Sequence, residues 1–540
     1  MEENIMSIKN SNQSTLKPRW LSAIALFVML YLMYSSTFLT DYLMRDEWEF
    51  VGGGDWYNLP RYMSTFFFRS GRVLFAVFQK LVLVFAGYDA SRIQIVRFIN
   101  FLSIALIAVV LMNFLEKRMK NGWVAFFAIL FFMSQSTFQA LMGYSFELIC
   151  GSLPSMWLSL LAFYLYFFVF DQGRLPKYLQ IGIVFIILML AMQSTQTYAY
   201  FALVPMSYLA LSDWKVNKVR VIEFLAVSIV TFALSALIYK IGLDFFAAQG
   251  RAGYDVGEQG IDQLATRPLD VFLLAINPRT YWSVFKMWTF PFPFQNTPPI
   301  INLTEKIASF LIMVTWFGLI FVSLWVEIKN TAKNERRDIF FKWIAVSFCF
   351  GLAATFIIAD SPKEIIDHRP HLLLVFLGLV IFTGVYSMEL LMAHFTFLRS
   401  PRFGVVVGFL VFMTAFGAQA GVLRNIVNIH MKQLDFIRTE LLSQDPVSYS
   451  TIIVLLPVEN QDCITEPCGP WIGEHIENKG HLAREAAYHY ALSTLGMSPT
   501  EKNIVFVEKL ADIDSQENAI IINWNIYSST QQLYAEHFLP

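Results

Sequence analysis

The chain has 540 residues, with 40 basic and 41 acidic side chains, and it is 56% hydrophobic and 15% charged. A soluble domain carries roughly 25% charged residues, so the composition excludes an ordinary soluble multidomain protein. The near-neutral charge gives no general attraction to nucleic acid, and four cysteines exclude a disulfide-rich scaffold. The sequence therefore predicts a polytopic α-helical membrane protein.

Eleven charge-poor segments are candidates for membrane-spanning helices, because a hydrocarbon core about 30 Å thick needs about 20 mostly apolar residues per helix. The predicted spans cover residues 21–40, 98–115, 122–141, 150–170, 178–194, 198–212, 222–239, 307–326, 343–359, 372–388 and 403–423. The polar residues 193–197 interrupt one long uncharged stretch and predict a tight turn between two spans.

The distribution of lysine and arginine sets the orientation of these spans. Basic residues gather in five loops, and the positive-inside rule places these loops and the N-terminus in the cytoplasm. The loops cover residues 116–121, 171–177, 213–221, 327–342 and 389–402. Residues 73–88 are also apolar, but a further span there would invert all of these loops. We therefore expect residues 73–88 to lie flat on the outer surface as an interfacial helix.

This orientation gives long outer loops at residues 41–92 and 240–306, and it places the tail, residues 424–540, outside the membrane. The tail contains three strand-like runs and one helical stretch, which predict a small α/β domain following a transmembrane domain over residues 1–423. The strands are expected at 451–456, 503–507 and 519–524, and the helix at 480–495. Cys463 and Cys468 lie in this tail and are expected to form a disulfide in an oxidising compartment, with two free thiols as the alternative.

Charged side chains are concentrated at the start of the first outer loop, and a charge against the membrane is a functional candidate. Asp41, Asp46 and Glu47 follow the first span. The adjacent carboxylates of Asp46 and Glu47 could act as a general base or hold a divalent cation such as Mg or Mn. Arg69 and Arg72, later in the loop, could bind a phosphate. The alternative is a solvated loop with incidental ion pairs.

Two further positions are candidates. Glu147 is the one charged residue between positions 122 and 170, and it either caps the next helix or faces a site. Lys363, His368 and Arg369 lie in an outer loop and form a basic group that departs from the positive-inside rule. Ordinary surface solvation remains the alternative for this loop.

The pair Asp46-Glu47 followed by Gly-Asp-Trp at residues 54–56, in a long outer loop with a flat helix, resembles the GT-C glycosyltransferase superfamily. Both elements are similar to those of lipid A aminoarabinose transferases and their protein-mannosyltransferase relatives. The spacing to Gly71-Arg72 is more similar to that of bacterial O-antigen glucosyltransferases of the serotype-converting type, which usually have two aspartates where this chain has Asp46-Glu47. The likeness covers about residues 20–425.

The resemblance implies an inverting glycosyltransferase of the bacterial inner membrane, with its C-terminal domain in the periplasm. Such an enzyme moves a hexose, here expected to be glucose, from a polyprenyl-phosphate carrier to a glycan such as the lipopolysaccharide O-antigen. By match to the motif Asp46 is the base, while Glu47 and Glu147 assist it or hold a cation. Arg72 and Arg369 are expected, by position, to bind the phosphate. An O-antigen polymerase or ligase and a lipid-linked glycan transporter are the alternatives.

Overall fold

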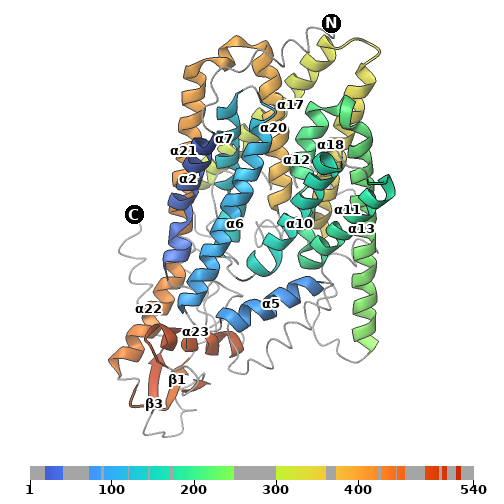
Figure 1. Ribbon diagram of the computed structural model, residues 1–540. Helices are drawn as coiled ribbons and strands as arrows, with labels where there is room; N and C mark the ends of the chain where they lie inside the picture. Colours follow the sequence, from blue (N-terminus) through green and yellow to red (C-terminus); the bar gives the residue numbers. More distant parts are fainter. Residues whose placement is uncertain are drawn as a thin grey trace.

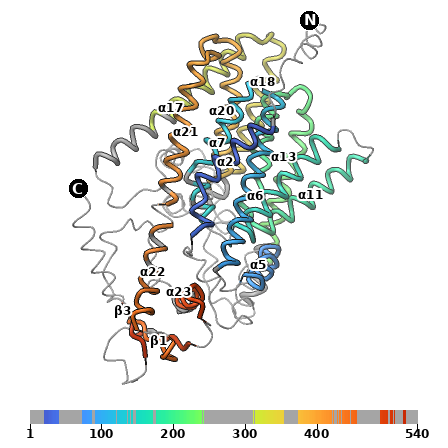
Figure 2. The backbone as a smooth tube through the Cα atoms, turned by 60° about the vertical axis from the view of Figure 1, so that its left-hand side comes forward, coloured from blue at the N-terminus to red at the C-terminus, as the bar shows by residue number. Residues whose placement is uncertain are grey.

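The computed structural model describes residues 19–40, 72–86, 90–119, 121–143, 146, 148–170, 175–248, 299–359, 373–423, 427–444, 447–455, 481–497, 502–507 and 519–523. These residues form a long bundle of helices with a small parallel sheet below one of its ends (Figure 1). Figure 2 shows the same arrangement from a second side, with the sheet again beyond the end of the bundle.

The bundle is built from twelve described α-helices and several short turns of other helix types. The α-helices are α2 (Arg19–Leu39), α6 (Ala90–Glu116), α7 (Gly122–Met133), α8 (Ser136–Gly143), α10 (Leu153–Tyr164), α11 (Lys177–Ser194), α12 (Leu203–Ser212), α13 (Trp214–Ala248), α17 (Pro299–Asn330), α18 (Arg336–Ala359), α20 (Leu374–His394) and α21 (Pro401–Val422). The π-helical turns η1 (Leu148–Ser152) and η2 (Leu165–Val169) flank α10. The 3-10 turns η3 (Gln196–Tyr200) and η5 (Thr396–Arg399) precede α12 and α21.

Eight described spans are long and apolar enough to cross a membrane, and there are nine if α7 and α8, bent by 59°, form one broken span. The predicted class of multi-pass helical membrane protein is therefore confirmed. All eleven predicted segments are helical, but two fall short of an independent span. Residues 198–212 are divided between η3 and the ten-residue α12. The helix α18 begins with the charged stretch 336–342, which leaves a short apolar part.

Side chains from three of the basic loops meet at one end of the bundle, which we call the basic end. Arg118, after α6, lies 3.8 Å from the carboxylate of Asp213, between α12 and α13. Lys215, at the start of α13, lies 2.8 Å from Glu335, just before α18. These ion pairs bring the loops near 118, 213 and 335 together, as expected if they share one side of the membrane.

Serine side chains of α10 satisfy the backbone of the break between α11 and η3. The Ser155 hydroxyl lies 3.0 Å from the Ala191 carbonyl oxygen and 2.8 Å from that of Thr195. Ser159 donates to the Ala199 carbonyl at 2.7 Å. A backbone group without a partner is costly in lipid, so these bonds stabilise the break. The turn predicted near residues 193–197 is present, and Thr195 is buried rather than exposed in an outer loop.

The helix α5 (Val73–Ala86) lies across the end of the bundle opposite the basic end, which we call the α5 end (Figure 1). It has 14 residues, which are too few to cross a bilayer. Its buried face includes Phe75 and Leu83, and it packs against η1, α11 and α6. Leu81 and Val84 on the opposite face are 61% and 72% exposed. A helix lying flat with an exposed apolar face suits a membrane interface, as predicted for residues 73–88.

The C-terminal residues form a three-stranded parallel sheet with two helices. The strands are β1 (Thr451–Leu455), β2 (Asn503–Val507) and β3 (Ala519–Asn523), in the order β2-β1-β3. Ile453 at the centre of β1 pairs with Val505 of β2 and Ile521 of β3. The helix α23 (His481–Thr494) lies between β1 and β2 in sequence. The three strands and this helix confirm the predicted elements, whereas α22 (Asn428–Ser443) was not predicted.

One edge of this sheet is closed by a side chain. The Gln444 amide nitrogen donates to the Ile521 carbonyl at 2.9 Å, and the Ile521 N–H donates to the Gln444 amide oxygen at 3.2 Å. Gln444 follows α22 directly, so this double hydrogen bond also joins α22 to β3.

A buried apolar cluster connects the sheet to the bundle. It combines Leu83 of α5 and Ile93 of α6 with Ile437 of α22, Val454 of β1 and Tyr488 of α23. Because the cluster is continuous, the C-terminal unit is docked on the α5 end and is not an independent body on a linker. Any site at this end therefore has the C-terminal unit beside it.

Candidate functional site

The predicted site residues belong to segments that join described elements at the α5 end. Arg72 lies in the part of the chain that the structure describes. Asp41, Asp46, Glu47, Arg69, Glu147, Lys363, His368 and Arg369 lie outside the described residues, as do Cys463 and Cys468. The helices on either side of these segments are described, and their ends show where each segment begins and ends.

Arg72 lies immediately before α5 and is half-buried. Its carbonyl oxygen accepts a hydrogen bond from the Ala76 N–H at 3.1 Å, which closes the first turn of the helix. Arg72 is therefore fixed where the first outer loop meets the flat helix. This position suits a cation that binds an anionic group at a membrane interface.

Arg97 on α6 is a buried cation at this end that sequence reasoning missed. Its side chain is 1% exposed, and Nη1 donates to the carbonyl oxygen of Thr40 at 3.3 Å. Thr40 follows the last turn of α2, and the acidic segment that begins with Asp41 comes directly after it. A guanidinium at the carboxyl end of a helix is electrostatically favourable. In the sequence Arg97 stands directly before the predicted span 98–115, and it was not among the candidate residues.

Glu147 lies outside the described residues, but its two neighbours in the sequence are described. Phe146 and Leu148 on either side of it are both fully buried. Leu148 begins the π-helical turn η1, and turns of this type are frequent at functional sites. The residues that flank Glu147 therefore belong to the interior of the protein.

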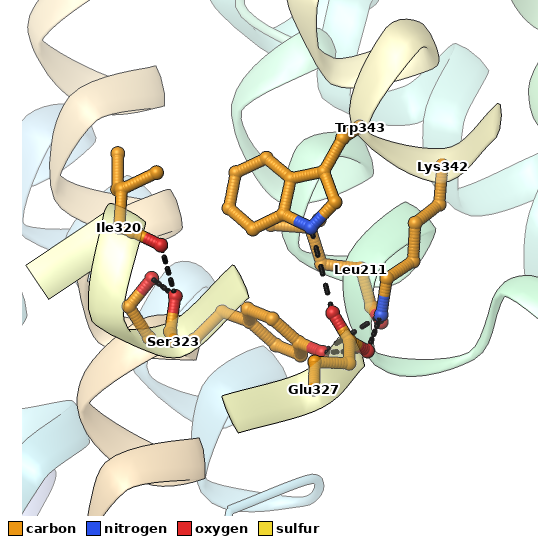
Figure 3. A network of polar contacts seen from close by, with 8 residues as sticks. Leu211, Ile320, Ser323, Glu327, Lys342 and Trp343 are labelled. Carbon is orange, nitrogen blue, oxygen red and sulfur yellow. Dashed lines mark hydrogen bonds and ion pairs between the residues drawn. The ribbon is translucent and has the colours of Figure 1, made fainter. Parts of the chain in front are cut away.

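A second group of buried charges lies toward the basic end, between α17, α18 and α20 (Figure 3). Lys342 is 5% exposed and forms an ion pair with Glu327. Its Nζ also donates to the Tyr386 hydroxyl at 2.9 Å and to the Leu211 carbonyl at 3.2 Å. Tyr386 in turn donates to Glu327 at 3.0 Å.

This network corrects the placement of Lys342. The sequence assigned it to a cytoplasmic loop, whereas the structure buries it in α18, close to the carboxyl end of α12. The charges of Lys342 and Glu327 neutralise each other, and the bond to Leu211 satisfies a terminal carbonyl of α12. A buried charge in a membrane helix is a functional candidate. Because both charged groups here have partners within the protein, they fit a structural contact that holds the helices together better than a reactive site.

Within the described residues, no group of three or more histidine, cysteine, aspartate or glutamate side chains could hold a metal ion. The carboxylates expected to hold a divalent cation, Asp46, Glu47 and Glu147, lie outside those residues. Comparison with known proteins found no family model that matches the chain, no curated relative and no solved structure of similar fold.

Proposed function

We propose that this protein is an inverting glycosyltransferase that moves a hexose from a polyprenyl-phosphate carrier to a glycan outside the bacterial inner membrane. Glucose is the proposed hexose, because the motif spacing is similar to that of the serotype-converting glucosyltransferases. The observation that carries the proposal is α5, a flat helix with an exposed apolar face at the end of the bundle where the acidic segment begins. A long lipid tail stays in the bilayer while its phosphate reaches the interface, and α5 lies at such an interface.

In the proposed reaction, Asp46 accepts the proton of an acceptor hydroxyl on the glycan. The acceptor oxygen attacks the anomeric carbon of the donor, a new glycosidic bond forms, and the bond between that carbon and the phosphate oxygen breaks. The electron pair leaves with the phosphate, and polyprenyl phosphate is the second product. Positive groups beside the leaving phosphate stabilise the charge that develops on it. Arg72 and Arg369 are the proposed phosphate ligands.

The remaining parts of the proposal concern the setting of this reaction. Glu47 and Glu147 assist Asp46 or hold a divalent cation, and the acceptor is a periplasmic glycan such as the O-antigen of lipopolysaccharide. The chain crosses the membrane eleven times, with η3 and α12 counted as one span. About 17 helical residues from η3 to the end of α12 extend roughly 25 Å, close to the thickness of a hydrocarbon core.

The test is the substitution Asp46→Asn, assayed as sugar transfer in membranes supplied with polyprenyl-phosphate glucose and an O-antigen acceptor. A placed general base contributes roughly 10²–10⁴-fold to a rate, so transfer should fall by about that factor. Expression and donor binding should be unchanged. Glu47→Gln should lower transfer less if Glu47 only assists, and as much if both carboxylates hold a cation.

The matched control is Asp435→Asn on α22, which removes an exposed carboxylate paired with Arg438. Its transfer rate should equal that of the wild type. A wild-type rate for Asp46→Asn would contradict the role of the base. Absence of any sugar transfer by the wild type, with extension or ligation of an intact glycan instead, would favour a polymerase or ligase.

A further inference from the structure

Three buried polar side chains beneath α5 have hydrogen-bonding atoms without a partner. Gln79 is 1% exposed, and neither its amide oxygen nor its amide nitrogen makes a hydrogen bond. The hydroxyl oxygens of Ser152 and Thr195 also have no partner, and these residues are 0% and 2% exposed. Most buried polar groups in proteins are paired, so these unpaired atoms require an explanation.

The three side chains come from elements that meet at one place. Gly151 and Ser152 end η1, and a Cβ built on Gly151 would lie 2.3 Å from Thr195 Oγ1 and 2.5 Å from Phe75 Cδ2. The absence of a side chain at Gly151 therefore allows η1, the turn after α11 and α5 to approach closely. Gln79 lies one helical turn after Phe75, on the same buried face of α5.

Other polar residues nearby show that the fold can satisfy such groups. Ser155, one turn after Ser152 on α10, lies within hydrogen-bond distance of two carbonyls of the α11 break. Gln180, also buried, donates to the Leu175 carbonyl at 2.8 Å. The unpaired atoms of Gln79, Ser152 and Thr195 are therefore a feature of the junction beneath α5.

We propose that Gln79, Ser152 and Thr195 bind hydroxyl groups of a neutral, polyhydroxylated ligand, which is the sugar of the lipid-linked donor. This inference rests on the proposed function and names the residues that recognise the donor sugar. An amide offers both a donor and an acceptor, and a hydroxyl offers either. None of the three side chains is ionised, so the set matches an uncharged sugar and not the carrier phosphate. Gln79 is then a specificity-determining residue.

The experiment compares the binding of polyprenyl-phosphate glucose and of polyprenyl phosphate without sugar to the purified full chain in detergent. The wild type should bind the glucosylated lipid more tightly. Gln79→Leu keeps the approximate size of the side chain and removes both polar atoms. It should weaken binding of the glucosylated lipid by about tenfold and leave binding of the sugar-free lipid unchanged. Thr195→Val should act in the same direction and serves if Gln79→Leu fails to fold.

The matched control is Gln180→Leu, which removes a buried glutamine that has a partner within the protein. It should lower the thermal unfolding midpoint without changing the preference for the glucosylated lipid. Gln79→Leu should leave that midpoint unchanged or raise it, because no internal hydrogen bond is lost.

Two results would overturn the inference while the proposed function stands. In the first, the wild type transfers sugar, and its preference for the glucosylated lipid is unchanged in Gln79→Leu and Thr195→Val. In the second, the unfolding midpoint of Gln79→Leu falls as far as that of Gln180→Leu. A wild type that binds neither lipid and transfers no sugar would overturn both proposals together.

Discussion

The guanidinium of Arg97 on α6 donates a hydrogen bond to the carbonyl oxygen of Thr40, 57 residues earlier in the chain. The bond joins the carboxyl end of α2 to α6 at the point where the acidic segment leaves the bundle. Arg97 is among the largest fully buried side chains in the described residues. A charge held in this way fixes the start of the segment that carries Asp41, Asp46 and Glu47.

Replacement of Arg97 by leucine should lower the free energy of unfolding by about 2 kcal/mol, because a hydrogen bond from a charged group contributes roughly 1.5–3 kcal/mol. The measurement is the thermal unfolding of the purified protein in detergent. Arg92→Leu is the control, since Arg92 is exposed and lies one and a half turns earlier on the same helix. An Arg97→Leu protein as stable as the wild type would show that the end of α2 is held by other contacts.

The ion pairs Arg118–Asp213 and Lys215–Glu335 predict that the loops of the basic end share one side of the membrane. With the basic loops in the cytoplasm, reporter fusions after Lys120, Lys218 and Arg337 should report cytoplasm. Fusions after Gly260 and Gly480 should report the opposite side. A cytoplasmic signal from the fusion at Gly480 would contradict the orientation and change the span count by an odd number.

The pair Lys342–Glu327 should be strongly coupled. Lys342→Met leaves the Glu327 carboxylate without its cation, and Glu327→Gln does the converse, so each should destabilise the protein by about 3–5 kcal/mol. The double variant should lose much less stability than the sum of the losses in the two single variants. The exposed pair Lys215–Glu335 is the control, and its variants should each change stability by less than about 1 kcal/mol. If the losses in the free energy of unfolding from the two substitutions were additive, the pair would not hold the helices together.

His489 on α23 is 3% exposed, and burial lowers the pKa of its imidazole from 6.5 to about 4. The unfolded chain binds a proton below pH 6.5, whereas the folded chain does so only near pH 4. The contribution of His489 to stability is therefore complete above pH 6.5 and is lost as the pH falls to about 4. The loss amounts to on the order of 3 kcal/mol.

The corresponding experiment measures the unfolding midpoint of the purified full chain between pH 4 and 7.5. His489→Gln should flatten the dependence over that interval. A His489→Gln protein with the same pH profile as the wild type would assign the dependence to other groups.

The elements that follow from local sequence pattern were predictable. Residues 451–456, 503–507 and 519–524 are runs of β-branched and apolar residues, and the structure places strands there. The flat helix α5 was predicted from the distribution of basic residues among the loops. Its own residues are apolar enough to suggest a membrane span. The helix α22 was not predicted, because its mean hydropathy is low and the apolar pattern of the last span does not continue into it.

The polar contacts inside the bundle were not predictable, because they join residues distant in sequence. Lys342 and Glu327 lie 15 residues apart on two helices, and nothing in either segment specifies that they face each other. The same holds for Gln79, whose sequence context is an apolar helix and whose burial depends on η1 and α11. Of the predicted site residues, Arg72 lies within the described part of the chain. The roles of all of them stay predictions: Asp41, Asp46, Glu47, Arg69, Arg72, Glu147, Lys363, His368 and Arg369.

The double hydrogen bond between Gln444 and Ile521 has a consequence for how the C-terminal sheet can grow. An exposed strand edge is a template for pairing with another extended chain. The Gln444 amide occupies the N–H and carbonyl of Ile521, which lie at the centre of β3. An incoming peptide would first have to displace it. Strand addition, whether by a partner peptide or by a second copy during aggregation, is therefore disfavoured at β3 and should be directed to the β2 edge.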